Sequence, residues 1–298
     1  MLEASYSACR RITRSAASNF YYAFFLLPRP KRDALSALYA FMRRVDDISD
    51  SPGDLSKKQA QLAARRAALD ETLAARATGD EILPALVDTV RRFAIPPRYL
   101  HDLISGAEMD LSVTTYPTFD RLREYCYRVA GTVGLCCVHV FGFDPPAADA
   151  PDLAEKLGIA FQLTNIVRDI PRDLQMGRVY LPLEDLKRFG CHVADLSAAK
   201  PSPALLALVE FEAARAWKFY EEGAQLVPLV HPDSRAALAG LVRIYSGLLR
   251  KIEARGYDVF SPPPVRLSAP AKAWALLRAR LGAGPGDAAV AAARGQSR

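Results

Sequence analysis

The stretch YAFMRRVDDISD, residues 39–50, joins an apolar helical face to closely spaced acidic residues. Four residues follow the spacing i, i+4, i+7 and i+11: Tyr39, Arg43, Asp46 and Asp50. This spacing places their side chains on one stripe of an α-helix, where the two aspartates repel each other one turn apart. A bound cation would offset that repulsion, and carboxylate oxygens are ligands that Mg²⁺ prefers. An acidic helix end that simply faces water is the alternative, and this stretch alone does not decide between the two.

A second stretch, FQLTNIVRDIPRD at residues 161–173, repeats the pattern. Its polar residues follow the spacing i, i+3, i+7 and i+11: Gln162, Asn165, Asp169 and Asp173. The residues between them are mostly apolar, which indicates a buried helix, and an unpaired buried carboxylate is costly. Two such stripes on different helices therefore predict a shared cage that holds a polyanion through metal ions. Arg43 and Arg168 would then contact the phosphate oxygens of that polyanion.

Hydrophobic residues recur with a helical period along most of the chain, and no segment alternates with a period of two. We expect helices over residues 31–50, 55–76, 96–109, 119–141, 152–170, 203–223, 233–256 and 271–281. The pattern predicts an all-α protein that folds as a single domain over residues 1–281. Residues 282–298 are rich in Gly and Ala and almost lack large apolar side chains, so we predict a disordered tail there.

Charge and cysteine usage exclude several classes of function. The net charge is +6, but Lys and Arg are spread along the chain, so we expect no nucleic-acid partner. The five cysteines show no CxxC spacing and the four histidines are scattered, which argues against a zinc site and favours reduced thiols. No apolar run reaches membrane-spanning length. We therefore expect a cytoplasmic protein, and peripheral contact with the inner face of a membrane through the basic, aromatic N-terminal segment is a hypothesis.

Six segments together resemble the squalene/phytoene synthase family, a branch of the all-α class I isoprenoid synthases. They are SNFYY (18–22), ALYAFMR (37–43), DDISD (46–50), YCYRVAGTVG (125–134), QLTNIVRD (162–169) and GRVYLP (177–182). The resemblance runs over nearly the whole chain before the tail. It implies a helical bundle around a central cavity, and a Mg²⁺-dependent prenyltransferase that condenses two prenyl diphosphates head to head with release of diphosphate.

The resemblance also implies roles for individual residues. Several Mg²⁺ ions that bridge the diphosphates would be held by Asp46, Asp50, Asn165, Asp169 and Asp173. The two prenyl diphosphates would be bound by Ser18, Asn19, Phe20, Tyr22, Tyr39, Arg43, Gln162, Arg168, Tyr180 and Tyr245. Catalytic roles would fall to Tyr127, Arg43 and Tyr39.

The chain departs from the family pattern at two places. Pro171 lies between Asp169 and Asp173, where it removes a backbone donor and should kink or end the helix. Either the stripe bends there, or Asp173 is a weaker ligand than the rest. Three prolines occupy residues 262–264, where relatives often carry arginine, so we expect no phosphate contact from that loop and Lys272 as the substitute.

The resemblance leaves the product open. We expect C15 farnesyl diphosphate as the substrate, giving presqualene diphosphate, squalene or dehydrosqualene, and NADPH would be needed only for squalene. The alternatives are a phytoene synthase that uses C20 geranylgeranyl diphosphate, a different class I terpene synthase, and a non-catalytic relative that acts in assembly. The sequence does not predict the oligomeric state.

Overall fold

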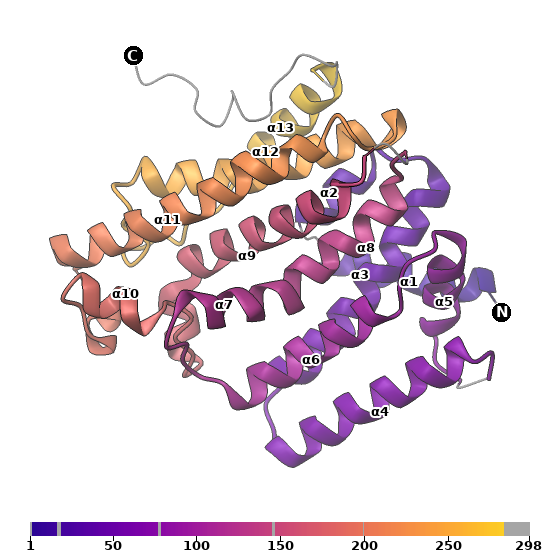
Figure 1. The fold of residues 1–298 in the computed structure, drawn as a ribbon, viewed down its shortest axis with the longest axis horizontal. Helices are drawn as coiled ribbons and strands as arrows, with labels where there is room; N and C mark the ends of the chain where they lie inside the picture. Colours follow the sequence, from indigo (N-terminus) through magenta and orange to yellow (C-terminus); the bar gives the residue numbers. More distant parts are fainter. Residues whose placement is uncertain (1, 17–18, 77–78, 145–146, 199, 283–298) are drawn as a thin grey trace.

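The computed structural model describes residues 2–16, 19–76, 79–144, 147–198 and 200–282 (Figure 1). The order of its main helices is α1 (Leu2–Ala16), α2 (Asn19–Phe24), α3 (Arg29–Asp50), α4 (Leu55–Leu73), α5 (Leu83–Arg92), α6 (Arg98–Ser112), α7 (Phe119–Cys126), α8 (Thr132–Phe141), α9 (Ala150–Gln175), α10 (Leu183–Arg188), α11 (Pro203–Gly223), α12 (Pro232–Glu253) and α13 (Ala269–Leu281). These residues contain no strand, and their bridges, Thr115 to Val179 and Phe143 to Val230, are isolated. The prediction of an all-α, single-domain fold is confirmed. The predicted tail, residues 282–298, lies outside the described residues except for Gly282.

The long helices were predicted more closely than the short ones. The helix at 203–223 agrees with α11, and the helix at 31–50 agrees with α3 to within two residues. The helix expected at 119–141 is divided by a π-helical turn, Tyr127–Gly131, into α7 and α8. The sequence analysis missed α1, α2, α5 and α10. Three of these helices have ten residues or fewer, and such short helices depend on tertiary packing for most of their stability, so their local pattern is weak. This reason does not apply to α1, which has 15 residues.

The helix α9 corrects the expectation for Pro171. We expected the helix to kink or end there, but α9 continues four residues past the proline to Gln175. The proline forfeits one backbone hydrogen bond, but Ile166, Val167 and Ile170 just before it are buried and tie the helix to the core. Packing offsets the local cost of about 3 kcal/mol that proline carries inside a helix. Asp173 therefore remains on the same helix as Asp169.

The bundle is built around α9, which crosses the middle of the view between α8 and α12 (Figure 1). Two glycines let α9 contact its neighbours backbone to backbone. A Cβ atom on Gly158 would lie 2.2 Å from the carbonyl oxygen of Ala130, and one on Gly134 would lie 2.2 Å from that of Ala154. No larger residue fits at either position, so these two glycines set how closely α9 approaches α8 and the π-helical turn before it.

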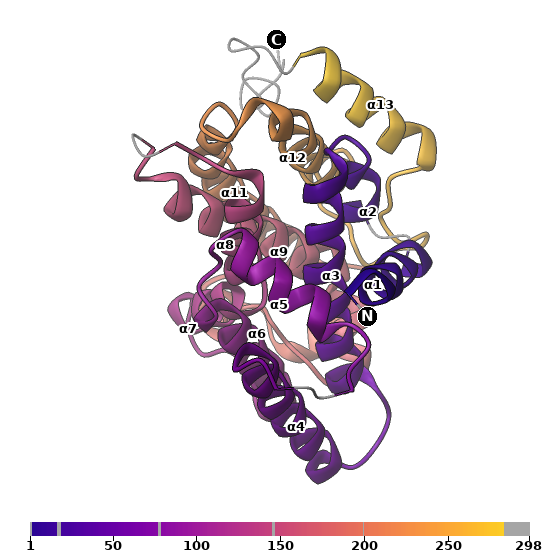
Figure 2. The ribbon, with the colours of Figure 1, turned by 90° about the vertical axis from the view of Figure 1, so that its right-hand side faces the viewer.

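The last helix, α13, packs on α12 and α2 at one side of the bundle (Figure 2). None of the described helices is both long and apolar enough to cross a membrane. The segment that joins α12 to α13 runs back over the bundle and contributes several residues to the cavity described below.

A buried acidic group lies on α11. Glu212 is 2 % exposed, and its carboxylate accepts a hydrogen bond from Arg215 at 2.6 Å; Arg215 also donates to the buried Asp185 at 2.9 Å. One oxygen of Glu212, Oε1, has no hydrogen-bond partner among the described residues. Burial raises the pKa of Glu212 to about 7, and the charge of Asp185 adds to the effect against the opposing charge of Arg215.

Replacing Gly158 with alanine should destabilise the fold, because the added methyl group meets a backbone oxygen that cannot move aside. We expect Gly158→Ala to lower the free energy of unfolding by about 1–3 kcal/mol in urea titrations. Gly247→Ala on α12 is the matched control, since its Cβ would make an ordinary 3.5 Å contact with Leu267. It should be neutral or stabilise the protein by up to about 1 kcal/mol. Equal stability of the two variants would contradict the close approach of α9.

The raised pKa of Glu212 predicts how stability depends on pH. Between about pH 4.5 and 7 the folded protein keeps a proton that the unfolded chain has released, so this contribution falls as pH rises and is lost above pH 7. The unfolding free energy of the wild type minus that of Glu212→Gln should therefore decrease from pH 5 to pH 8, by at most about 1.4 kcal/mol per pH unit. Denaturant titrations across this range measure it, and a difference that grows with pH would reject the assignment.

Candidate functional site

A cavity of about 1080 Å³ opens between α3, α8, α9 and α12. Most of the predicted site residues line it: Phe20, Tyr39, Arg43, Asp46, Asp50, Gln162, Asn165, Arg168, Asp169, Asp173, Tyr180 and Tyr245. Both acidic stripes thus face one space, as the matched spacing predicted. The volume is at the upper end of the roughly 300–1,000 Å³ that is usual for ligand pockets.

Four predicted residues are not among those that line the cavity. Ser18 and the side chain of Asn19 lie outside what the structure describes. The Tyr127 hydroxyl donates to Asp102 at 3.2 Å, and burial together with that carboxylate raises the pKa of Tyr127 to about 12. Tyr22 lies beneath Lys272, whose Nζ is 5.2 Å from the ring centre. The metal, substrate and catalytic roles stay predictions for these residues and also for the predicted residues that line the cavity.

Asp46 shows that carboxylates at the polar end of the cavity repel one another. Water reaches its carboxylate from the cavity, yet protein atoms enclose it on the other sides. This enclosure raises the pKa of Asp46 to about 7, and the charges of Asp50 and Asp110 add to the effect more than Arg43 opposes it. A cation placed there would reverse the balance and favour the ionised carboxylate.

Arg168 partly neutralises the negative charge of the second stripe. Arg168 makes two hydrogen bonds to its neighbour Asp169, through Nε at 2.8 Å and through Nη2. Asp173 has no such partner, and burial and the charge of Asp169 raise its pKa to about 7. Among the described residues, the charges of Arg172 and Arg178 oppose this rise in the pKa of Asp173 but do not cancel it.

A polar network that was not expected from the sequence connects α6 and the segment after α9 with the stripe on α3. Tyr180 and Tyr125 donate hydrogen bonds to Asp110 at 2.8 and 3.1 Å, and burial raises the pKa of Asp110. Arg178 donates to Asp50 at 3.0 Å and so connects the segment after α9 to α3. Arg178 lies in the quoted GRVYLP segment and could have been found there. Asp110 is a single aspartate near the end of α6 and has no sequence signal.

The other end of the cavity is apolar and aromatic. Phe161 stacks on Tyr245 with ring centres 4.4 Å apart, and Phe20 lies 5.7 Å from Tyr245. Aliphatic side chains complete this wall: Val133, Leu157, Leu226, Leu238 and Leu241. Such a wall excludes water, and aromatic faces attract cations. The cavity therefore combines a charged end with a long apolar chamber.

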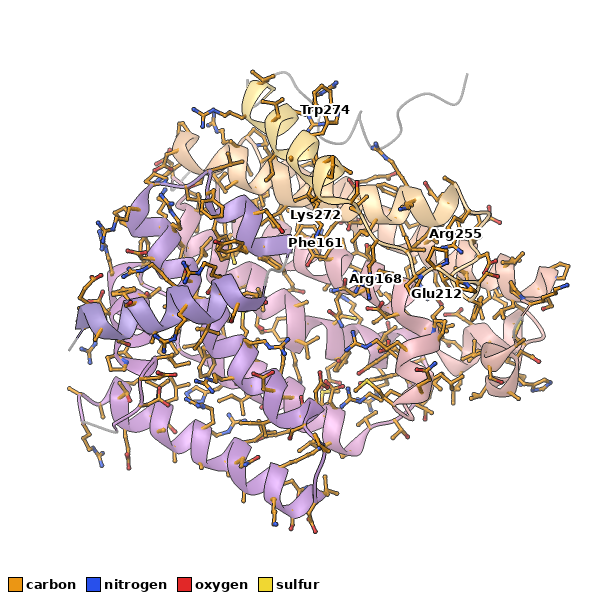
Figure 3. All side chains as sticks on the ribbon, turned by 180° about the vertical axis from the view of Figure 1, so that it is seen from behind. Phe161, Arg168, Glu212, Arg255, Lys272 and Trp274 are labelled. Atoms are coloured by element: carbon orange, nitrogen blue, oxygen red, sulfur yellow. The ribbon has the colours of Figure 1, made fainter. Side chains whose placement is uncertain are left out.

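Lys272 reaches this cavity from α13, where Figure 3 draws it near Phe161 and Arg168. Burial lowers the pKa of Lys272, and the charge of Arg168 lowers it further. Pro262 and Pro264 line the same side. The structure thus brings Lys272 to the place where the sequence analysis expected a substitute for the missing arginine.

The carboxylates fit Mg²⁺ bound together with a polyphosphate better than Mg²⁺ bound by protein alone. Among the described residues, no three His, Cys, Asp or Glu side chains come close enough to hold one metal ion. Mg²⁺ usually takes one or two carboxylates and fills its other positions with water and substrate phosphate. Asp46 with Asp50, and Asn165 with Asp169 and Asp173, offer such partial ligand sets from two helices.

Comparisons with known proteins point in the same direction. Residues 13–271 match the sequence family described as squalene/phytoene synthase. A phytoene synthase of Mycobacterium tuberculosis is 42 % identical over 265 residues, which cover 86 % of this chain and 85 % of that protein. A solved dehydrosqualene synthase in complex with ligand superposes with a TM-score of 0.86 at 33 % identity, covering 94 % of this chain and 96 % of that one. A squalene synthase of Alicyclobacillus acidocaldarius superposes at 0.79 with 32 % identity, covering 86 % and 96 %.

Removing one carboxylate from the cavity should weaken joint binding of Mg²⁺ and inorganic pyrophosphate. We expect Asp46→Asn to lower the affinity at least about tenfold in calorimetric titrations, because a ligand oxygen loses its charge. Asp120→Asn is the matched control, since Asp120 is exposed at the start of α7 and does not line the cavity. It should change the affinity by less than about threefold. Equal losses in both variants would show that the stripe on α3 does not bind the metal.

Proposed function

Because the chain belongs to the squalene/phytoene synthase family, we propose that it condenses two molecules of geranylgeranyl diphosphate head to head into phytoene. The observation that carries the reaction class is the single cavity, with two acidic stripes at one end and an aromatic chamber at the other. The mycobacterial relative that is named a phytoene synthase supports the C20 substrate. The sequence alone favoured the C15 substrate and kept a phytoene synthase with a C20 substrate as an alternative. The names of the relatives support that alternative better.

The charged end prepares the departure of diphosphate. Arg43, Arg168 and Lys272 face the cavity and would bind phosphate oxygens. When bound, Mg²⁺ supplies Lewis-acid stabilisation of the charge that gathers on the leaving diphosphate. The C1–O bond of the first substrate breaks, and the electron pair leaves with the diphosphate. An allylic cation remains in the chamber.

The apolar end then controls what attacks the cation. Phe161, Tyr245 and Phe20 place aromatic faces around the chamber, where they stabilise positive charge and keep water away. The C2–C3 double bond of the second substrate attacks the cation, and loss of a proton closes a cyclopropane ring. We assign that proton to the expelled diphosphate, because the Tyr127 hydroxyl does not line the cavity and already donates to Asp102.

The second half of the reaction needs no reductant. The cyclopropylcarbinyl diphosphate loses its own diphosphate, and the ring opens to join the two C1 atoms. Loss of another proton forms the central double bond of phytoene. The proposal therefore requires no NADPH, which would be needed only if a hydride ended the reaction, as in squalene.

Product analysis tests the proposal. The purified protein, incubated with MgCl₂ and either geranylgeranyl or farnesyl diphosphate, should yield a C40 hydrocarbon from the former with kcat/KM at least about tenfold higher, a difference of about 1.4 kcal/mol in activation free energy. Chromatography with mass detection identifies the product. A preference for C30 products would show that farnesyl diphosphate is the substrate. If neither substrate released diphosphate, the proposal that the protein is a prenyltransferase would be rejected.

A further inference from the structure

The outer face of α13 carries a stripe of exposed apolar side chains. Trp274, Leu277 and Leu281 follow the spacing i, i+3 and i+7, and they are 60 %, 45 % and 75 % exposed. The opposite face of the helix packs inward: Ala279 is fully buried, and Leu276 lies against Gly240 of α12. The stripe therefore points away from the bundle, as Figure 3 shows for Trp274.

Basic side chains flank this stripe. Arg278 and Arg280 are exposed in the last turn of α13, and the guanidinium of Arg278 lies 5.9 Å from the centre of the Trp274 ring. Residues 259–281 contain four basic residues and no acidic one. Within the described part of the chain, no carboxylate forms an ion pair with either arginine of α13. Their positive charge is therefore available to an external anion.

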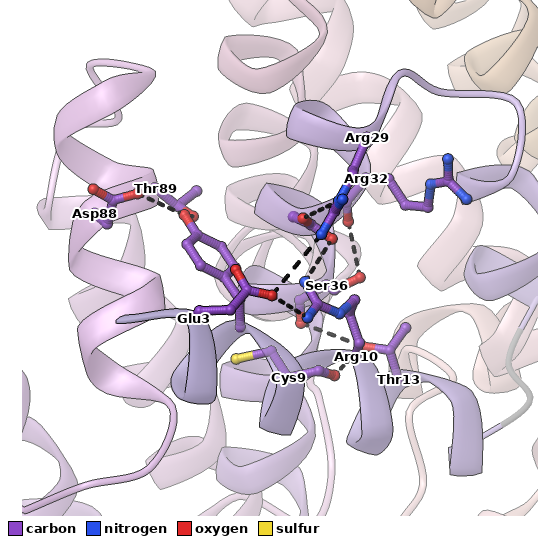
Figure 4. A network of polar contacts seen from close by, with 11 residues as sticks. Glu3, Cys9, Arg10, Thr13, Arg29, Arg32, Ser36, Asp88 and Thr89 are labelled. Atoms are coloured by element: carbon purple, nitrogen blue, oxygen red, sulfur yellow. Dashed lines mark hydrogen bonds and ion pairs between the residues drawn. The ribbon is translucent and has the colours of Figure 1, made fainter. Parts of the chain in front are cut away.

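The N-terminal segment, which the sequence analysis favoured for membrane contact, differs in this respect. Arg10 pairs with Glu3 at 2.7 Å and with Asp33 at 3.2 Å, and Figure 4 shows it inside a network of polar contacts. Arg11 pairs with Glu81 at 3.3 Å. Arg14 is exposed and forms no ion pair among the described residues, so the segment offers one unpaired arginine where α13 offers two.

We propose that α13 is a docking helix for the surface of an anionic lipid bilayer. The apolar stripe would enter the region between headgroups and acyl chains, and Arg278 and Arg280 would contact lipid phosphates. An apolar face flanked by basic residues is typical of helices that lie in a membrane interface. In a symmetric contact with a second copy of this chain the basic face would meet itself, and the like charges of Arg278 and Arg280 argue against that occupant.

The inner face of the same helix forms part of the cavity wall. Lys272 lines the cavity, as do Val265 and Leu267 in the segment leading into α13. Docking through the outer face would therefore hold the cavity wall close to the bilayer, in which a hydrophobic substrate or product dissolves. The docking itself rests on the surface of α13 alone and does not depend on which prenyl diphosphate is used.

Vesicle flotation tests the proposal with the full-length protein. The protein should float with vesicles of phosphatidylcholine and phosphatidylglycerol, and much less with vesicles of phosphatidylcholine alone. The triple variant Trp274→Ser, Leu277→Ser, Leu281→Ser should lose at least about tenfold in vesicle affinity. Each of Arg278→Gln and Arg280→Gln should lose about fivefold, which corresponds to about 1 kcal/mol per basic residue near an anionic surface. Trp274 fluorescence should shift to shorter wavelength when anionic vesicles are added.

Matched controls come from exposed residues on other parts of the molecule. Leu55→Ser and Val193→Ser remove apolar side chains that are 49 % and 38 % exposed, and Arg121→Gln removes an exposed charge on α7. These variants should float like the wild type, and unchanged thermal unfolding should show that every variant is folded. Equal flotation of the triple serine variant and the wild type would overturn the proposal. A wild-type dimer that the serine variant converts to a monomer, without vesicle binding, would overturn it in favour of self-association.

Discussion

Repulsion among the carboxylates that gather at one end of the cavity is the constraint on which the rest of the site depends. Asp46, Asp50, Asp110, Asp169 and Asp173 line the same space, and Arg168 and Arg178 pair with only two of them. Burial and mutual repulsion raise the pKa values of Asp46 and Asp173 to about 7. Without a bound cation, such a cluster costs stability. The surrounding helices must therefore be held by other means.

The required rigidity comes from packing on the faces that point away from the cavity. The backbone of α9 touches α8 at Gly134 and touches the π-helical turn before α8 at Gly158, so α9 cannot slide along these neighbours. Val45 of α3 and Val167 of α9 are buried behind the acidic stripes. Because the carboxylates are fixed by their helices rather than by each other, the site keeps its shape while their charges repel. That preorganisation suits a site meant to bind metal and diphosphate together.

The polar and apolar ends of the cavity serve opposite needs of the proposed reaction. Diphosphate must be held and released where charge is stabilised, whereas the carbocation must be protected from water. Stacking of Phe161 on Tyr245 marks where the chamber becomes aromatic. Lys272 adds a basic group from α13, the helix whose outer face we assign to the membrane. One helix thus connects the reacting end of the cavity with the surface through which hydrophobic molecules would pass.

The sequence by itself determined the helical class and both acidic stripes. Helical periodicity and the i, i+4, i+7 and i+11 spacing are local properties, so Asp46 and Asp50 could be placed on one face of α3 before any fold was known. It also predicted Arg43 and Arg168 as phosphate contacts, because Arg43 lies on the first stripe and Arg168 directly precedes Asp169 of the second. The same local reasoning failed at Pro171, where burial of α9 outweighed the cost of proline in a helix.

Only the tertiary structure decided which distant groups meet. Asp110 carries no sequence signal, and its contacts with Tyr125 and Tyr180 join residues up to 70 positions apart. The salt bridge from Arg178 to Asp50 spans 128 positions. The helical pattern predicted that residues 271–281 form a helix, but not which face would be covered. That choice depends on how α12 and α2 pack, because burial is a property of the whole bundle rather than of a single segment.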